Sequence, residues 1–347
     1  TAIIKLQKNT EATQTIHLNV NTILCLEGNS LNMASGQGIE FCNDLEIQNG
    51  SIDFSEVNIA IKSNILEEGN ENGSFVMNNV NIVHKCSSEI GDIYTINLDS
   101  SLINISNCNI NSEQLSELSG KVTAIYVNNE SAVVDLKNNN IETSGYSVNN
   151  ISVKSNLLKL QGNVLNVERT QYGYNLRASS GIVKILSGKM FCKTSYSGSN
   201  ISSSAENVVI DNCECICDGM SGKGSWCFGM TFWGEADIVI NNANVVTKAK
   251  NYSAALQVES LKTNVEINGG YYYANPIDMG DTNSNGTGIL NSGKIRITEK
   301  ENPVTVIGGN AAITCDRGST TVIDGGTFKS PSHGGAYICC GDTGYCE

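Results

Sequence analysis

Residues 45–52 read Leu-Glu-Ile-Gln-Asn-Gly-Ser-Ile, and this phrase contains the pattern that decides the fold. Two apolar residues alternate with polar ones, an Asn-Gly pair follows, and another apolar residue closes the phrase. Alternation with a period of two is typical of a β-strand, and Asn-Gly is typical of a tight turn. The phrase therefore predicts a short strand, a turn and the start of a second strand.

The same phrase recurs along the chain at intervals that fit one coil of a β-helix. Its second apolar residue returns every 21 to 31 residues, with a mean of 27. Three short strands and their bends use about that many residues at roughly 3.3 Å per residue. A further alternating strand lies upstream of the phrase, for example at residues 39–41 and 313–315. The second apolar residues are Leu26, Ile47, Met77, Ile105, Leu136, Leu160, Ile185, Ile210, Ile240, Ile267, Ile297 and Ile323.

These spacings predict an all-β fold, a right-handed parallel β-helix of about 12 coils with three short strands per coil. We expect one domain over residues 1–347, cut from a larger protein whose neighbouring domains cover an exposed end. A helical solenoid would need apolar residues at a period of 3.6, and the chain shows period two instead. Stacked coils would form an inner apolar ladder and a ladder of turn residues, namely Asn49, Asn79, Asn107, Asn138, Asn212 and Asn242.

Three phrases carry a family resemblance: TILCLEGNSL at residues 22–31, DLEIQNGSI at 44–52 and TTVIDGGTF at 320–328. They resemble those of pectate-lyase-like right-handed β-helix proteins, especially the repetitive surface proteins of bacteria. The resemblance covers nearly the whole chain and implies the fold. It leaves activity open, because lyases, hydrolases and adhesins share this scaffold.

The charge balance restricts the partners. The net charge is −13, from 22 Lys and Arg against 35 Asp and Glu. Such a surface repels phosphate backbones and anionic membranes, so we expect neither a nucleic-acid partner nor membrane insertion. A polysaccharide or glycan surface remains as the expected partner, and we expect the protein to be secreted or displayed on a cell surface.

The motifs that the resemblance associates with catalysis are missing. Arg296-Ile297 is the only Arg-Ile pair, it is followed by Thr, and His333 lacks an upstream paired-Asp motif. The sequence thus favours a non-catalytic carbohydrate-binding or adhesin-like module. Two alternatives stay open: a polysaccharide lyase or glycoside hydrolase acting on an acidic polysaccharide, and a structural stalk.

Aromatic residues gather in the C-terminal half and give the best candidate for a binding site. Aromatic rings beside carboxylates are a common way to bind sugars, by stacking and by hydrogen bonds to hydroxyls. Tyr272 falls on an inward position, so its two neighbours are expected to point outward. The alternative is that these rings fill the core or stack between coils. The predicted carbohydrate-binding residues are Trp226, Trp233, Glu235, Tyr271 and Tyr273.

A calcium loop is the one cofactor that the sequence suggests. Asp281, Asn283 and Asn285 match the first half of an EF-type loop, in which oxygen ligands alternate before a Gly. The twelfth position is Ser292 where a Glu is needed, so an ordinary turn is the alternative.

The 13 cysteines also leave alternatives. Cys192 and Cys217 occupy equivalent positions on consecutive coils, and Cys213, Cys215 and Cys217 alternate, so the latter three face the same way. They could form disulfides, bind a metal or fill the core as small apolar residues. We favour the last.

Overall fold

The computed structural model describes residues 1–64, 73–87, 91–115, 120–179, 181–219, 225–276, 285–300, 302–316, 318–331, 338–340 and 345–346. Strands make up 71% of the structure, no helix is present in this described part, and the chain forms a right-handed parallel β-solenoid of about 11 turns. The predicted fold class is confirmed, and the number of turns is close to the 12 expected. The described residues include no helix able to cross a membrane.

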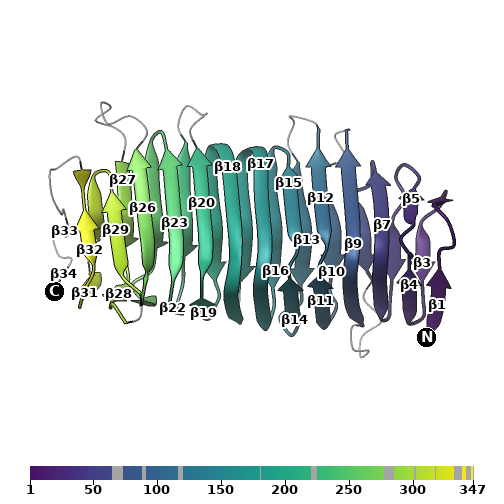
Figure 1. Ribbon diagram of the computed structural model, residues 1–347, viewed down its shortest axis with the longest axis horizontal. Helices are drawn as coiled ribbons and strands as arrows, with labels where there is room; N and C mark the ends of the chain where they lie inside the picture. The colour runs from purple at the N-terminus through teal and green to yellow at the C-terminus, as the bar shows by residue number, and fades with distance from the viewer. Residues whose placement is uncertain are drawn as a thin grey trace. The chain divides into compact units, whose positions relative to one another are not determined.

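Each coil contributes a strand to three faces, which we name A, B and C in chain order. The strand pairings in the described part of the chain are parallel, and each joins a strand to its counterpart one coil away, as in the pair of β11 and β14. Contacts divide the chain into two compact units, Thr1–Glu168 and Arg169–Glu347. Figure 1 shows the same order of faces within each unit.

In unit 1 the strands follow the order A, B, C, and two long strands turn from face A onto face B without a break. These long strands are β7 (Leu45–Ser55) and β9 (Ser74–Cys86). Face A also holds β1 (Ala2–Lys5), β4 (Thr22–Cys25), β11 (Leu102–Ser106) and β14 (Val133–Lys137). Face B also holds β2 (Thr10–Ala12), β5 (Ser30–Met33), β12 (Asn109–Gln114) and β15 (Asn140–Ser144). Face C holds β3 (Ile16–Leu18), β6 (Ile39–Phe41), β8 (Ile59–Ser63), β10 (Ile93–Leu98), β13 (Lys121–Asn128) and β16 (Ser147–Lys154).

Unit 2 repeats the order of faces. The strand β17 (Leu157–Ser179) begins in unit 1 and ends in unit 2, and β18 (Ile182–Ser204) passes through all three faces. Face A then holds β19 (Asn207–Ile210), β22 (Asp237–Ile240), β25 (Asn264–Ile267), β28 (Lys294–Ile297), β31 (Thr320–Ile323) and β34 (Tyr345–Cys346). Face B holds β20 (Cys213–Gly219), β23 (Ala243–Ala249), β26 (Gly270–Pro276), β29 (Val304–Gly308) and β32 (Thr327–Lys329). Face C holds β21 (Trp226–Phe232), β24 (Tyr252–Val258), β27 (Asn285–Asn291), β30 (Ala311–Cys315) and β33 (Ile338–Cys340).

The inner ladder is the predicted one, with a single change of register. Ile47, Met77 and Ile105 stack as expected, and the positions from Ile185 to Ile323 do so in unit 2. The prediction that Leu26 stacks on Ile47 is wrong, because Leu24 does so instead. The bend between β4 and β5 has two more residues than the equivalent bend within β7, and Leu26 lies fully buried within it.

The predicted turn ladder is also present. All of its Asn residues except Asn242 adopt φ between 47° and 60°. Asn tolerates this region better than most other non-glycine residues. Their amides bond from coil to coil: Asn79 Nδ2 donates to Asn49 Oδ1 at 3.1 Å, and Asn242 Nδ2 donates to Asn212 Oδ1 at 3.0 Å. One residue type thus meets the backbone demand of the turn and links neighbouring coils.

Apolar side chains from all three faces fill the interior of each unit. In unit 1 the rings of Phe41 and Phe75 stack with centroids 5.6 Å apart, and in unit 2 Tyr272 is fully buried as predicted. Each buried aliphatic or aromatic side chain stabilises the fold by roughly 1.5–3 kcal/mol before entropy is counted. The core uses the inward positions, so outward side chains are free to serve other purposes.

Candidate functional site

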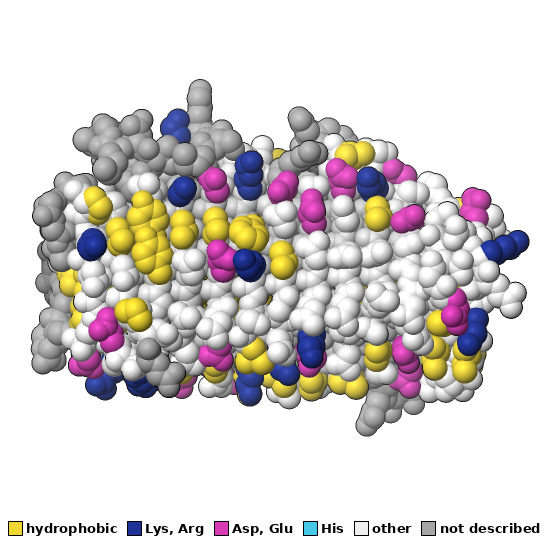
Figure 2. Space-filling view, viewed as in Figure 1, with side chains coloured by type: hydrophobic (Ala, Val, Ile, Leu, Met, Phe, Trp, Pro, Cys, Tyr) yellow, Lys and Arg dark blue, Asp and Glu magenta, His cyan; other side chains and the backbone are white. Residues whose placement is uncertain are grey.

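Face B of unit 2 carries an outward-facing apolar row, which we call the outer apolar row. Its members stack in register on five consecutive strands, β18, β20, β23, β26 and β29, and all are partly exposed. At roughly 4.8 Å between strands the row is about 19 Å long. Figure 2 shows hydrophobic side chains gathered in a band over these strands. The row consists of Phe191, Ile216, Val246, Tyr273 and Ile307.

The equivalent outward row of unit 1 has the opposite character. It occupies the same place in the coil, one residue after the inward ladder, yet all but one of its members are polar or charged. The β-solenoid therefore does not require apolar residues at this position. The unit 1 row consists of Asn32, Asp53, Val83, Asn111, Glu142 and Asn166.

Two of the predicted binding residues lie in this region and contact each other. Tyr271 and Tyr273 both point outward from β26, with ring centroids 6.0 Å apart and ring planes 13° from parallel. Tyr271 remains 37% exposed. Partial burial, helped by the nearby Tyr273, raises the pKa of Tyr271 above its usual value. The phenol is thus protonated at neutral pH and can both donate and accept hydrogen bonds.

Polar side chains border the outer apolar row on both sides. Along one edge Lys189 and Glu214 form an ion pair at 3.2 Å, and Thr305 stacks beside Tyr271. Along the other edge Asp218 and Lys248 are in register on β20 and β23. The arrangement is an apolar strip between two lines of hydrogen-bonding groups.

The other predicted binding residues lie elsewhere in the coil. Trp226 begins β21 on face C, is 50% exposed and stacks in register on Tyr252. Trp233 follows the end of β21, is 42% exposed, and its Nε1 donates to Ser202 Oγ at 3.2 Å. Glu235 lies on the bend after β21, where it pairs with Lys262 at 3.1 Å. Seven residues of extended chain, about 23 Å, separate the two tryptophans.

The five predicted residues thus occupy three places, and only the two tyrosines touch. The sequence analysis missed Phe191, Ile216, Val246 and Ile307. A signal was present: Met190-Phe191-Cys192 and Cys215-Ile216-Cys217 are runs in which the outward position is also apolar. These runs break the alternation expected of a strand with one solvated face.

Titratable groups in the described residues do not converge in the manner of an acid–base pair. Burial raises the pKa of Asp99 in unit 1 and of Glu259 in unit 2, and neither shift has a second carboxylate among its causes. No group of three His, Cys, Asp or Glu side chains among the described residues is arranged to hold a metal ion. The candidate calcium residues Asp281 and Asn283 lie outside the described residues, as does the side chain of Asn285.

The cysteines behave as buried apolar residues. The side chains of ten cysteines are described; no disulfide joins any two of these ten, and all but Cys42 are buried. Cys192 and Cys217 stack in register as predicted, without a disulfide. Burial and the neighbouring thiols Cys192 and Cys227 raise the pKa of Cys217, so its thiol stays neutral and unreactive.

Comparisons of the chain with protein-family models, with curated proteins and with solved structures give no match.

Proposed function

We propose that this chain is a secreted or cell-surface β-helix protein that binds carbohydrate without catalysis, in the manner of an adhesin. The observation that carries the proposal is the outer apolar row with its paired tyrosines, at a position that is polar in unit 1. The fold does not need these apolar side chains, and leaving them in contact with water is unfavourable. A ligand that covers them would remove that cost.

A saccharide is the ligand that the surroundings of the row favour. Sugar rings present apolar C–H faces, which suit Tyr271 and Tyr273, and equatorial hydroxyls, which suit the flanking groups. A flat row about 19 Å long matches several units of an extended chain. Trp233 and Glu235 would form a second contact point at the bend between faces C and A.

The family resemblance agrees with this proposal and adds the secreted location. Pectate-lyase-like β-helix proteins of the repetitive surface type are the class in which we place the chain, and a glycan surface is its proposed partner. A lyase, a hydrolase or a stalk are the competing functions. A stalk gives no reason for the contrast between the two outward rows, and no specific observation favours an enzyme.

Replacing both tyrosines tests the proposal. Each half-buried ring contributes about 1 kcal/mol of contact, so Tyr271→Ala with Tyr273→Ala should weaken binding tenfold or more on a neutral-glycan array. Phe replacements should retain most of the binding, because the rings remain. A matched control is Tyr126→Ala in unit 1, where Tyr126 packs against Tyr94 at 5.2 Å on a different face.

The outcomes separate the competing functions. Binding by the parent that survives in the double Ala variant would remove the proposed platform. An unsaturated or newly reducing end appearing in the glycan would show catalysis, and the non-catalytic part of the proposal would be wrong. Failure of the parent to bind any glycan would leave the stalk as the better account.

A further inference from the structure

A small cavity lies at the corner of unit 1 where the chain passes from face C to face A. The ends of β6, β8 and β10, on three successive coils, meet there. The cavity measures about 10 Å³, close to the room that one water-sized sphere needs. The lining residues that carry side-chain oxygen atoms are Asn43, Ser63, Asn64, Asp99 and Ser100.

The N–H donors that surround this cavity are already in use. Asn43 Nδ2 donates to a backbone carbonyl at 2.8 Å, and Asn64 Nδ2 donates to Glu40 Oε2 at 3.2 Å. The backbone N–H of Asp99 donates to Ser63 Oγ at 2.7 Å. The oxygen atoms of both amides are left as acceptors, so the lining is rich in oxygen and poor in donors.

Ser100 provides the observation that points to a ligand. It is 1% exposed and lines the cavity, and its Oγ has no hydrogen-bond partner among the described residues. A buried hydroxyl without a partner is unfavourable. Beside it, burial raises the pKa of Asp99 despite the opposing effect of Lys62, so the carboxylate charge is only partly compensated. A ligand in the cavity would stabilise both groups.

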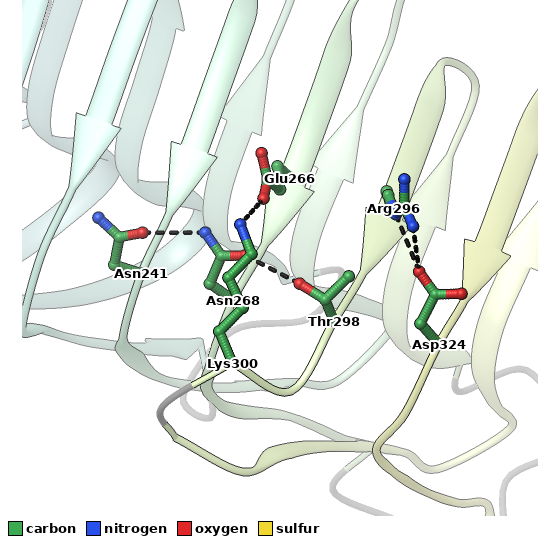
Figure 3. A network of polar contacts seen from close by, with 7 residues as sticks. All are labelled: Asn241, Glu266, Asn268, Arg296, Thr298, Lys300 and Asp324. Carbon is green, nitrogen blue, oxygen red and sulfur yellow. Dashed lines mark hydrogen bonds and ion pairs between the residues drawn. The ribbon is translucent and has the colours of Figure 1, made fainter.

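A polar cluster in unit 2 shows that such residues need no ligand when they bond to one another. Asn268 Nδ2 donates to Asn241 Oδ1 at 3.0 Å, and Thr298 Oγ1 donates to Asn268 Oδ1 at 2.9 Å. Arg296 donates through Nε and Nη2 to Asp324 Oδ2. Figure 3 shows these side chains directed at their partners. The corner of unit 1 differs, because a buried hydroxyl there is left without a partner.

We propose that this cavity binds one dehydrated alkali cation, sodium or potassium. The carboxylate of Asp99, the hydroxyl of Ser100 and the oxygens of the two amides coordinate it, and oxygen is the ligand that hard cations prefer. A water molecule fits less well, because it donates only two hydrogen bonds and the cavity has more acceptors than that. A divalent ion fits less well, because Asp99 is the only carboxylate among the described lining residues and Lys62 lies nearby. The site is independent of the outer apolar row and goes beyond the proposed function.

Thermal unfolding of the full chain in different chloride salts of equal ionic strength tests the proposal. Sodium or potassium chloride should raise the unfolding temperature relative to choline chloride, because choline is too large to enter and a ligand of the folded state stabilises it. Sodium NMR line broadening, reversed by added potassium, should report binding directly. Asp99→Asn should weaken the sodium affinity by about tenfold or more, the factor that follows from losing one contact to a charged group.

The Ser100→Ala variant separates a cation ligand from a merely structural hydroxyl. In choline chloride this variant should be at least as stable as the parent, because it removes an unpartnered polar group, whereas in sodium chloride it should gain less stability than the parent does. A matched control is Asp53→Asn, which removes an equal charge from an exposed position on face B of unit 1 and should keep the cation dependence of the parent.

Three results would each overturn the proposal. The first is an equal unfolding temperature of the parent in sodium, potassium and choline chloride. The second is an equal loss of unfolding temperature by Ser100→Ala in sodium and in choline chloride, which would indicate a structural role or a bound water. The third is a sodium affinity of Asp99→Asn that equals that of the parent.

Discussion

The interior of unit 1 contains a titratable group whose replacement has a calculable effect on stability. His84 is fully buried between faces B and C. Its Nε2 donates to the Val57 carbonyl at 2.8 Å, so Nδ1 is the unprotonated nitrogen and accepts from the Thr95 hydroxyl at 3.0 Å. Each nitrogen of the neutral ring thus has a hydrogen-bond partner, and a second proton would bury a positive charge in the core. Burial lowers the pKa of His84 from 6.5 to about 4, against smaller opposing effects from Val57 and Glu56.

The lowered pKa makes stability depend on pH in a defined direction. In the unfolded chain His84 binds a proton near pH 6.5, whereas in the folded protein it does so only near pH 4. Between these values the unfolded state binds more protons, so the free energy of unfolding falls as pH falls. The contribution is complete above about pH 6.5 and is lost by about pH 4. A shift of this size corresponds to about 3 kcal/mol.

Comparison with His84→Gln isolates this effect. Gln is uncharged at every pH, and the carboxylates that titrate in the same range are common to both proteins. The difference in unfolding free energy, parent minus variant, should therefore decrease by about 3 kcal/mol between pH 7 and pH 4 in urea titrations. Stacked repeats do not always unfold in one step, so imidazole NMR of the folded protein should supply a second measurement. An imidazole midpoint near 6.5, or parallel pH profiles for the two proteins, would refute the reasoning.

Three further predictions concern other parts of the chain. Gly162 stands in the turn ladder at φ 65°, and a Cβ there would lie 2.3 Å from Asn138 Oδ1. In chemical denaturation, Gly162→Val should lower the unfolding free energy by about 1–3 kcal/mol. Gly162→Asn introduces the residue that other coils use at this position, so it should lower the unfolding free energy by less than half as much. Trp233→Ala should weaken glycan binding severalfold. Its unfolding temperature should stay within about 2 °C of the parent's, since surface substitutions rarely change the free energy of unfolding by more than about 0.5 kcal/mol. Unchanged binding would exclude Trp233 from the glycan-binding site. Cys42 should react with a maleimide faster than Cys217 in native protein, as judged by peptide mass spectrometry, because it alone of the ten cysteines with described side chains is not buried; equal rates would contradict the described core.

Most of the fold could be predicted from the sequence because every coil places the same requirements on its residues. Inward positions must be apolar and the turn position must tolerate positive φ. These requirements recur about a dozen times, so the pattern remains clear even where single coils depart from it. The register of Leu26 was not predicted correctly because this pattern does not distinguish Leu24 from Leu26. Its bend holds two more residues than the next coil, and the pattern apolar-any-apolar fits either Leu24 or Leu26. Alternation alone cannot decide between registers that differ by two residues.

The candidate sites were only partly predictable because a binding surface on a solenoid runs across the coils. Tyr271 and Tyr273 are close in sequence, and alternation was enough to point them outward. Phe191 and Ile307 belong to the same surface, but they are 116 positions apart and join the row of Tyr273 only through stacking.

The contrast between the two outward rows shows which positions of a coil can carry information about function. An apolar inward residue is explained by the core, and an Asn in the turn by its backbone, so neither carries information about function. An outward position is under no such demand, as the row from Asn32 to Asn166 demonstrates with polar residues in the same place in the coil. Five successive coils that nevertheless carry Phe, Ile, Val, Tyr and Ile there have kept a costly exposure that the scaffold did not impose. This contrast is the reason for proposing that a ligand covers the row.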